Sequence, residues 1–266
     1  MTDETVVARD AVSKLRIGSV IARTFSVMFS NLPAFMFVAV MLSLIPLIFQ
    51  IMLGGVESLG ASYGAGDMQS GALALTFVVG FLSLMLAYIA QGAIVYGAVR
   101  SLDDQTAGFS ECVGRGLVLA LPLLGIAVVY SLGLMISLLL LVIPALIFFC
   151  VYFVVIPAAV MEKSGILGSF SRSAQLTRGN RWRILGLVLL GMLIIVTVSI
   201  GFGLVTGIIV IFAGPGNDAL LAAGLIEAVV NAVVMVFNAC LVSVTYYELR
   251  HLEGGTSLEK LSSVFD

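Results

Sequence analysis

The sequence predicts an all-α membrane protein with six transmembrane helices and short amphipathic helices at the membrane interface. Two observations on composition support this fold class: hydrophobic residues make up 61% of the 266 residues and charged residues only 11%, with a mean hydropathy of +1.17. A soluble domain has about a quarter charged residues, so this chain could not cover a water-facing surface. The third observation is that all 13 Lys and Arg residues fall in alternate polar breaks between apolar stretches.

The apolar stretches give the transmembrane spans in order. A helix needs about 20 apolar residues to cross about 30 Å of hydrocarbon. Residues 117–160 are uncharged and would extend for roughly 66 Å as one helix, so Ile143-Pro144 is predicted to divide them into two spans. The Gly- and Pro-containing break at 213–218 separates the last two spans. The predicted spans are 32–53, 71–99, 117–141, 144–160, 184–212 and 219–247, in a membrane domain at 16–250 between a polar N-terminal tail at 1–15 and a cytoplasmic C-terminal tail at 251–266.

Three segments that precede pairs of spans resemble one another: residues 16–31, 108–116 and 165–183. Each contains a Phe-Ser pair and mixes apolar residues with cations at helical spacing, which is typical of an amphipathic helix at a membrane interface. The chain is therefore predicted to contain three repeats of an interfacial helix followed by a transmembrane hairpin. The alternative is that any segment beside a membrane has this composition.

The cations predict the orientation of the chain. They form four groups: Arg9, Lys14, Arg16 and Arg23; Arg100 and Arg115; Lys163, Arg172, Arg178, Arg181 and Arg183; and Arg250 and Lys260. The intervening breaks at 54–70, at Pro144 and at 213–218 contain no cation, and the loop at 54–70 is predicted to lie outside the cytoplasm. Loops rich in Lys and Arg stay cytoplasmic, so both termini are predicted to be cytoplasmic. No cleavable signal peptide is visible, and the first span is expected to act as its own insertion signal.

The second half of the chain contains its most recognisable motifs. They are Ile143-Pro144, Ile156-Pro157, Val160-Met161-Glu162 followed by Gly165, the segment from Ser171 to Arg183, and Tyr246-Tyr247-Glu248-Leu249-Arg250. With these motifs the chain resembles the membrane-domain family found N-terminal to some glycerophosphodiester phosphodiesterases, and related stand-alone bacterial inner-membrane proteins of uncharacterised function. The resemblance covers most of the chain and implies a location in the bacterial inner membrane.

Two features depart from that family. Ala145 stands where such proteins often have Gly after the Pro, and no soluble phosphodiesterase domain follows Arg250 in this sequence. The resemblance therefore implies a fold and a location, and no phosphodiesterase activity.

Glu227 is the only acidic residue inside a predicted span, about 12 Å below the outer end of the last helix. Asn231 and Asn238 lie about 40° and 20° from it around the helix, so the three are expected to form one polar stripe. Gln91 in the second span is the predicted partner from another helix. An intramembrane carboxylate can belong to a pathway for a proton, a cation or a polar headgroup. The alternative is a structural role in hydrogen bonds between helices.

The densest charge in the chain is the cluster of Arg172, Arg178, Arg181, Trp182 and Arg183. A cation next to an anionic leaflet contributes about 1 kcal/mol, and tryptophan is typical of the interfacial aromatic belt. The cluster predicts contacts with phospholipid headgroups. The alternative is an orientation signal with nonspecific attraction to lipid.

Gly203 and Gly207 form a G-x-x-x-G motif, reinforced by Gly201. Such spacing lets helix backbones approach closely. Packing within the monomer is favoured over a dimer face, because glycine is frequent in membrane helices.

The sequence gives little support for a catalytic function. His251 is the only histidine, and no metalloprotease, serine-hydrolase or nucleotide-binding motif is present. Cys112, Cys150 and Cys240 are far apart and are expected to be small packing residues rather than a disulfide or metal site. No cofactor is expected, and no nucleic-acid partner, because the basic residues belong to the membrane face.

These features favour a non-enzymatic inner-membrane protein that interacts with lipids or acts as a scaffold in the cell envelope. The expected partners are membrane lipids, anionic ones above all, while a protein partner and a homo-oligomer stay open. The first alternative is a transporter or channel for a small solute or lipid that uses Glu227, Asn231, Asn238 and Gln91. The second is an accessory membrane subunit of a soluble phosphodiesterase.

Overall fold

The computed structural model describes residues 15–55, 70–103, 105, 108–162, 164–213 and 216–265, without the side chains of 54, 70–76, 109, 210, 213 and 254–265. Within these ranges the chain is all-helical and contains no strand, which confirms the predicted fold class. The predicted N-terminal tail and the predicted outer loop at 54–70 lie almost wholly outside the described residues. The described helices are α2 (Ile17–Ser30), α3 (Leu32–Gly54), α5 (Ser70–Leu102), α6 (Phe109–Leu140), α7 (Val142–Val151), α8 (Val155–Glu162), α9 (Gly165–Leu176), α10 (Arg181–Ala213) and α11 (Asn217–Phe265).

Six helical segments of the described chain are long and apolar enough to cross a membrane, as the sequence predicts. They are Leu32–Leu53, Phe77–Leu102, Ser110–Leu140, Val142–Glu162, Arg181–Ile209 and Asn217–Glu253.

The fourth of these segments consists of two short helices, α7 and α8, joined by a turn at 152–154. Pro144 and Pro157 each stand at the third position of one of these helices. In the first turn of a helix, the missing N–H of proline removes no helical hydrogen bond. The break predicted at Ile143-Pro144 therefore falls slightly earlier, at Leu141, which has an extended backbone between α6 and α7.

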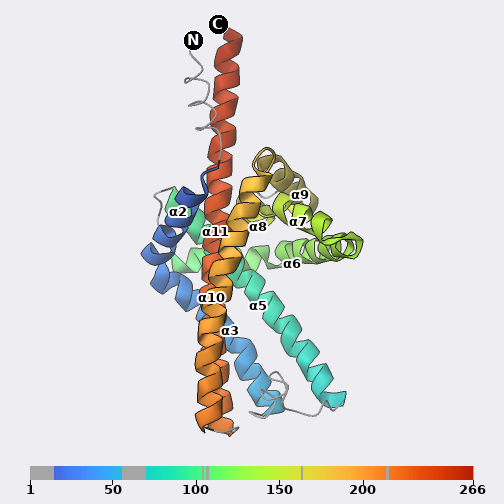
Figure 1. Cartoon of the computed structure of the whole chain (residues 1–266), viewed down its shortest axis with the longest axis vertical. Helices are drawn as coiled ribbons and strands as arrows, with labels where there is room; N and C mark the ends of the chain where they lie inside the picture. Colours follow the sequence, from blue (N-terminus) through green and yellow to red (C-terminus); the bar gives the residue numbers. More distant parts are fainter. Residues whose placement is uncertain are drawn as a thin grey trace.

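Three hairpins, α3/α5, α6/α7 and α10/α11, diverge from a common base (Figure 1). In this view α10 and α11 follow the long axis, α3 and α5 run obliquely, and α6/α7 extends crosswise. The chain therefore does not form a closed bundle of parallel spans. Apolar side chains such as Leu121, Leu139 and Phe212 remain 79%, 89% and 86% exposed. Because these helices are apolar around their whole circumference, lipid tails can cover the sides that no neighbouring helix covers.

The base of the molecule is its packed core. α2 buries one face, whose residues Val20, Thr24, Val27 and Met28 follow the helical period. This face packs against α11 and the C-terminal half of α5. Fully buried side chains of this core include Val20, Val95, Val99, Val154, Val236 and Tyr246.

α5 and α6 approach each other closely through small residues. A Cβ atom added at Gly116 would lie 2.5 Å from the carbonyl oxygen of Ile89, and one added at Gly92 would lie 2.8 Å from Leu123 Cδ1. The Ile89 carbonyl oxygen belongs to the backbone, which cannot move aside as a flexible side chain can. The crossing of the two helices therefore requires glycine at position 116.

Two of the three predicted interfacial segments form separate helices, α2 and α9, but the segment at 108–116 does not. It is the first part of α6, which continues unbroken to Leu140. The difference lies in the residues that end helices. α2 ends at Asn31, just before Pro33, and Gly179 with φ of +88° turns the chain after α9. Residues 109–121 contain no comparable break, and Pro122 is accommodated within α6.

α11 extends far beyond the predicted last span. Its 49 residues form one helix to Phe265, so the predicted C-terminal tail is helical as far as it is described. At about 1.5 Å per residue this helix is roughly 74 Å long, against about 30 Å of hydrocarbon. Its C-terminal part projects beyond the other helices (Figure 1).

Candidate functional site

The segments that carry cations gather at one end of the molecule. α2, the C-terminal end of α5, α9 and the start of α10 all lie in the upper half of Figure 1, whereas the turn between α10 and α11 lies at the opposite end. Three networks of polar contacts, each built on an arginine, join helices at the cation-bearing end.

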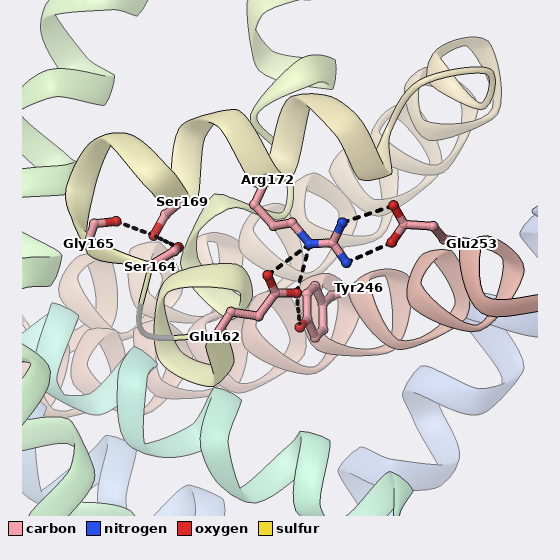
Figure 2. A network of polar contacts seen from close by, with 7 residues as sticks. All are labelled: Glu162, Ser164, Gly165, Ser169, Arg172, Tyr246 and Glu253. Atoms are coloured by element: carbon pink, nitrogen blue, oxygen red, sulfur yellow. Dashed lines mark hydrogen bonds and ion pairs between the residues drawn. The ribbon is translucent and has the colours of Figure 1, made fainter. Parts of the chain in front are cut away.

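The largest network joins α8, α9 and α11 (Figure 2). Arg172 of α9 donates from Nε to the two carboxylate oxygens of Glu162, at 3.0 and 2.8 Å. Its Nη1 and Nη2 donate to the two oxygens of Glu253, at 2.9 and 2.7 Å. Tyr246 donates its hydroxyl to Glu162 at 2.8 Å. A planar guanidinium can bridge two carboxylates in this way, whereas a lysine ammonium lacks the matching fork of donors.

Arg172 is therefore engaged by carboxylates within the protein. Its side chain is 24% exposed, and that of Glu162 is 23% exposed. The hydrogen bond to Glu253, followed by that to Glu162, raises the pKa of Arg172 above its ordinary value. The sequence places Arg172 in a headgroup cluster, but all three of its guanidinium nitrogens donate to carboxylates of other helices.

Hydroxyl groups fix the position of α9 as well. Ser173 and Thr177 donate to the carbonyl oxygen of Val151 at 2.9 and 3.1 Å, and thereby satisfy a backbone acceptor at the end of α7. At the other end of α9, Ser169 donates to the carbonyl oxygen of Gly165 at 2.7 Å (Figure 2). The helix is thus attached to α7 by hydroxyls and to α8 and α11 by the Arg172 network.

Two smaller networks join other helices at the same end. Arg23 of α2 forms an ion pair with Glu248 of α11 at 2.9 Å. Arg100 of α5 pairs with Glu111 of α6 at 3.0 Å, and Tyr96 donates its hydroxyl to the same carboxylate at 2.5 Å. These arginines connect neighbouring helices.

The turn between α9 and α10 carries two cations that face outward. Arg178, Arg181 and Trp182 are exposed, Trp182 by 85%. Neither arginine makes a hydrogen bond or ion pair with the part of the chain that the structure describes. Arg183 differs, because it is half-buried and donates to the carbonyl oxygen of Leu15 at 2.8 Å. We call Arg178, Arg181 and Trp182 the exposed turn cluster.

Glu227 and Asn231 line a cleft between α3, α5 and α11. Two adjoining cavities of about 390 and 170 Å³ share Ser43, Ser83 and Asn231 in their walls, and Glu227 and Gln50 line the smaller one. Both serine hydroxyls donate to the carbonyl one turn back, at 2.7 Å, so their oxygens are left as acceptors. Gln50 was not predicted to belong to this polar site, although it is the only amide side chain of the first predicted span.

Asn238 and Gln91 line a different pocket. Its volume is about 230 Å³, and it lies between α5, α6, the α7–α8 segment and α11, with Tyr88, Tyr130 and Tyr152 also in its wall. The predicted polar stripe is thus divided, and Gln91 lies with Asn238 rather than with Glu227. The tyrosines were not predicted because their spacing marks no motif and they come from three different helical segments, which only the fold brings together.

The glycine motif of α10 lies on an open surface of the chain. A Cβ atom added at Gly201, Gly203 or Gly207 would meet no described atom within 4 Å. The close packing within the monomer that the spacing predicted is therefore absent among the described residues.

Within the described residues, no group of three or more His, Cys, Asp or Glu side chains is placed to hold a metal ion. Cys112, Cys150 and Cys240 are buried as separate thiols. His251 packs its ring against Tyr247, with the ring centroids 4.4 Å apart.

Comparison with known proteins gives a family without an assigned activity. A family model described as a domain of unknown function (DUF7847) matches residues 11–249. No curated protein matches the chain, and no solved structure matches it. This match supports the predicted membership of an uncharacterised family. It shows no link to glycerophosphodiester phosphodiesterases, so that link remains a prediction.

Proposed function

Because the chain belongs to the DUF7847 family, whose function is unknown, we propose a role from its own geometry: a non-enzymatic multi-pass membrane protein that binds anionic lipid headgroups at the exposed turn cluster. The six apolar helices support the membrane location. The observation that carries the proposal is the contrast within one stretch of cations. Arg172 and Arg183 are engaged by the protein, whereas Arg178 and Arg181 face outward beside an exposed Trp182.

The chemistry of this cluster suits a phosphate group at a membrane interface. A guanidinium group can donate two parallel hydrogen bonds to phosphate oxygens, and tryptophan favours the headgroup region. The Arg172 network holds α9 against α8 and α11, so the position of the turn that follows α9 is fixed relative to these helices. Such preorganisation lowers the entropy lost when a headgroup binds.

We further propose that the cation-bearing end is cytoplasmic and that the membrane is a bacterial inner membrane. The first proposal follows from the preference of cationic loops for the cytoplasm. The second rests on the resemblance in the motifs of the second half of the chain.

Native mass spectrometry of the purified chain with phosphatidylglycerol tests lipid binding. We expect the double variant Arg178→Gln/Arg181→Gln to retain roughly tenfold less of this lipid, because each interfacial cation contributes about 1 kcal/mol or less. The matched control is Arg250→Gln, which removes an exposed cation from α11. Unchanged retention in the double variant, or an equal loss in the control, would contradict a specific site.

The cleft lined by Glu227 favours a second candidate function, the passage of a small cationic solute. A carboxylate, amide groups and acceptor hydroxyls line its walls. For this candidate we expect Glu227→Gln to abolish proton or potassium flux into liposomes while the protein stays folded. Asp218→Asn, at the outer end of the same helix, is the control. Equal flux in wild type and Glu227→Gln would exclude this function.

The connection to phosphodiesterases rests on the resemblance alone, and we retain it as a third proposal, a membrane subunit for a soluble phosphodiesterase. Purification of the tagged chain from its native membranes should then recover such an enzyme. Recovery of the chain without any phosphodiesterase would contradict it.

A further inference from the structure

The pocket lined by Gln91 and Asn238 contains polar groups that have no hydrogen-bond partner among the described residues. Its polar wall residues are Tyr88 and Gln91 of α5, Tyr130 of α6, Tyr152 of the α7–α8 turn and Asn238 of α11. All five are half-buried, and none of their side chains makes a hydrogen bond to the described part of the chain. They belong to segments apolar enough to cross a membrane.

These five side chains need a hydrogen-bond partner. No fully buried side-chain nitrogen or oxygen in the described residues lacks such a partner, so the unpartnered polar atoms of these five residues retain accessible surface. The pocket is the space that all five share. An unsatisfied polar group within the hydrocarbon region is costly, and the concentration of five around one cavity indicates a site for a polar occupant rather than for lipid tails.

The wall chemistry defines the class of occupant. The wall contains phenols and primary amides, each of which both donates and accepts hydrogen bonds, and it contains no Asp, Glu, Lys or Arg. A charged ligand would have no counter-charge there. The rest of the wall is apolar and aromatic, including Phe149 and Phe153. A ligand with several hydroxyl groups on a carbon ring or chain matches both the polar and the apolar part of this wall.

Two of the three tyrosine rings, those of Tyr130 and Tyr152, are held in place by a row of aromatic contacts. Tyr130 packs on Phe148 with ring centroids 5.5 Å apart, Phe148 on Tyr152 at 4.6 Å, and Tyr152 on Phe170 at 5.1 Å. A Cβ atom at Gly133 would lie 2.5 Å from the ring of Phe148, so glycine makes room for this row. Fixed rings reduce the entropy lost on binding.

We propose that this pocket binds an uncharged, hydroxyl-rich group, namely a polyol or sugar, either free or as the headgroup of a neutral glycolipid. The volume of about 230 Å³ is below the usual range for drug-sized ligands, so it admits a headgroup and not a whole lipid. The pocket lies between α5, α6, the α7–α8 segment and α11, and acyl chains could remain in the bilayer outside it. The site is separate from the exposed turn cluster and does not depend on anionic lipid binding.

Native mass spectrometry of the full chain tests this site with three probes: a monohexosyl diacylglycerol, the same diacylglycerol without its sugar, and free hexose as competitor. We expect wild type to retain the glycolipid and not the sugar-free lipid. The double variant Gln91→Leu/Asn238→Leu should retain about tenfold less, as the loss of one or two hydrogen bonds implies. Arg178→Gln/Arg181→Gln is the matched control and should retain the glycolipid fully while it loses phosphatidylglycerol.

Tyr130→Phe provides a milder variant, which keeps the ring and removes one hydroxyl, in case the double variant does not fold. Displacement of the glycolipid by free hexose would identify a soluble sugar as the source of the group, and resistance to displacement would identify the lipid. Equal retention of the sugar-free diacylglycerol would overturn the proposal, as would full glycolipid retention in both pocket variants, or no binding of either sugar probe to wild type.

Discussion

The arginines of the cation-bearing end differ in their contacts according to the neighbours that the fold gives them. Arg172 and Arg178 are six positions apart in one sequence cluster, yet the first bridges Glu162 and Glu253 and the second is exposed. The sequence predicts that such a cluster exists, because its charge is a local property. It does not predict which members are engaged, because the carboxylates come from α8 and α11.

Arg172→Gln should lower the free energy of unfolding by about 2 kcal/mol, because it removes charge-assisted hydrogen bonds to two partly buried carboxylates. Thermal unfolding in detergent measures this loss. In a double-mutant cycle, the loss in Arg172→Gln/Glu162→Gln should be smaller than the sum of the single losses. Arg178→Gln is the exposed control and should change stability by about 0.5 kcal/mol or less. A strictly additive cycle would contradict the coupling.

At the scale of the helices, the number of membrane-length helices could be predicted from the sequence and their contacts could not. Apolar length and proline or glycine breaks are local signals, and they gave the six apolar helices. Contact surfaces depend on which face meets a neighbour, and a helix that is apolar all round does not encode this. The sequence pattern therefore pointed to Gly201, Gly203 and Gly207, whereas the close helix crossing uses Gly92 and Gly116.

Gly116→Ala should destabilise the protein, because the added Cβ would lie 2.5 Å from the backbone carbonyl oxygen of Ile89 and would force α5 and α6 apart. Gly114→Ala, on the same helix, meets open space. There the change should be neutral or stabilising by about 0.5–1 kcal/mol, since alanine is the better helix former. Unfolding midpoints of the two variants make the comparison, and similar midpoints would show that the crossing is looser than the structure indicates.

The whole molecule consists of three diverging hairpins on a packed base (Figure 1). This divergence could not be predicted from hydropathy, which gives the same signal for parallel and for splayed spans. The Glu227 cleft lies between α3, α5 and α11, and the tyrosine-lined pocket lies between α5, α6, the α7–α8 segment and α11. Polar residues of α11 therefore line two separate cavities.

The sidedness of the molecule can be tested with cysteine substitutions in cells that express the chain. Ser62→Cys, in the predicted outer loop, should react with a membrane-impermeant maleimide from outside, whereas Ser171→Cys on α9 should react only after lysis. The native cysteines give little background, because Cys112, Cys150 and Cys240 are only 8%, 4% and 0% exposed. The reverse pattern would invert the proposed orientation.

α11 runs without interruption from its polar residues deep in the membrane to its projecting end. Glu227 and Glu253 are both on this helix, about 39 Å apart along its axis. No break interrupts the helix between them, so a tilt imposed on the projecting end would also displace the Glu227 carboxylate inside the membrane span.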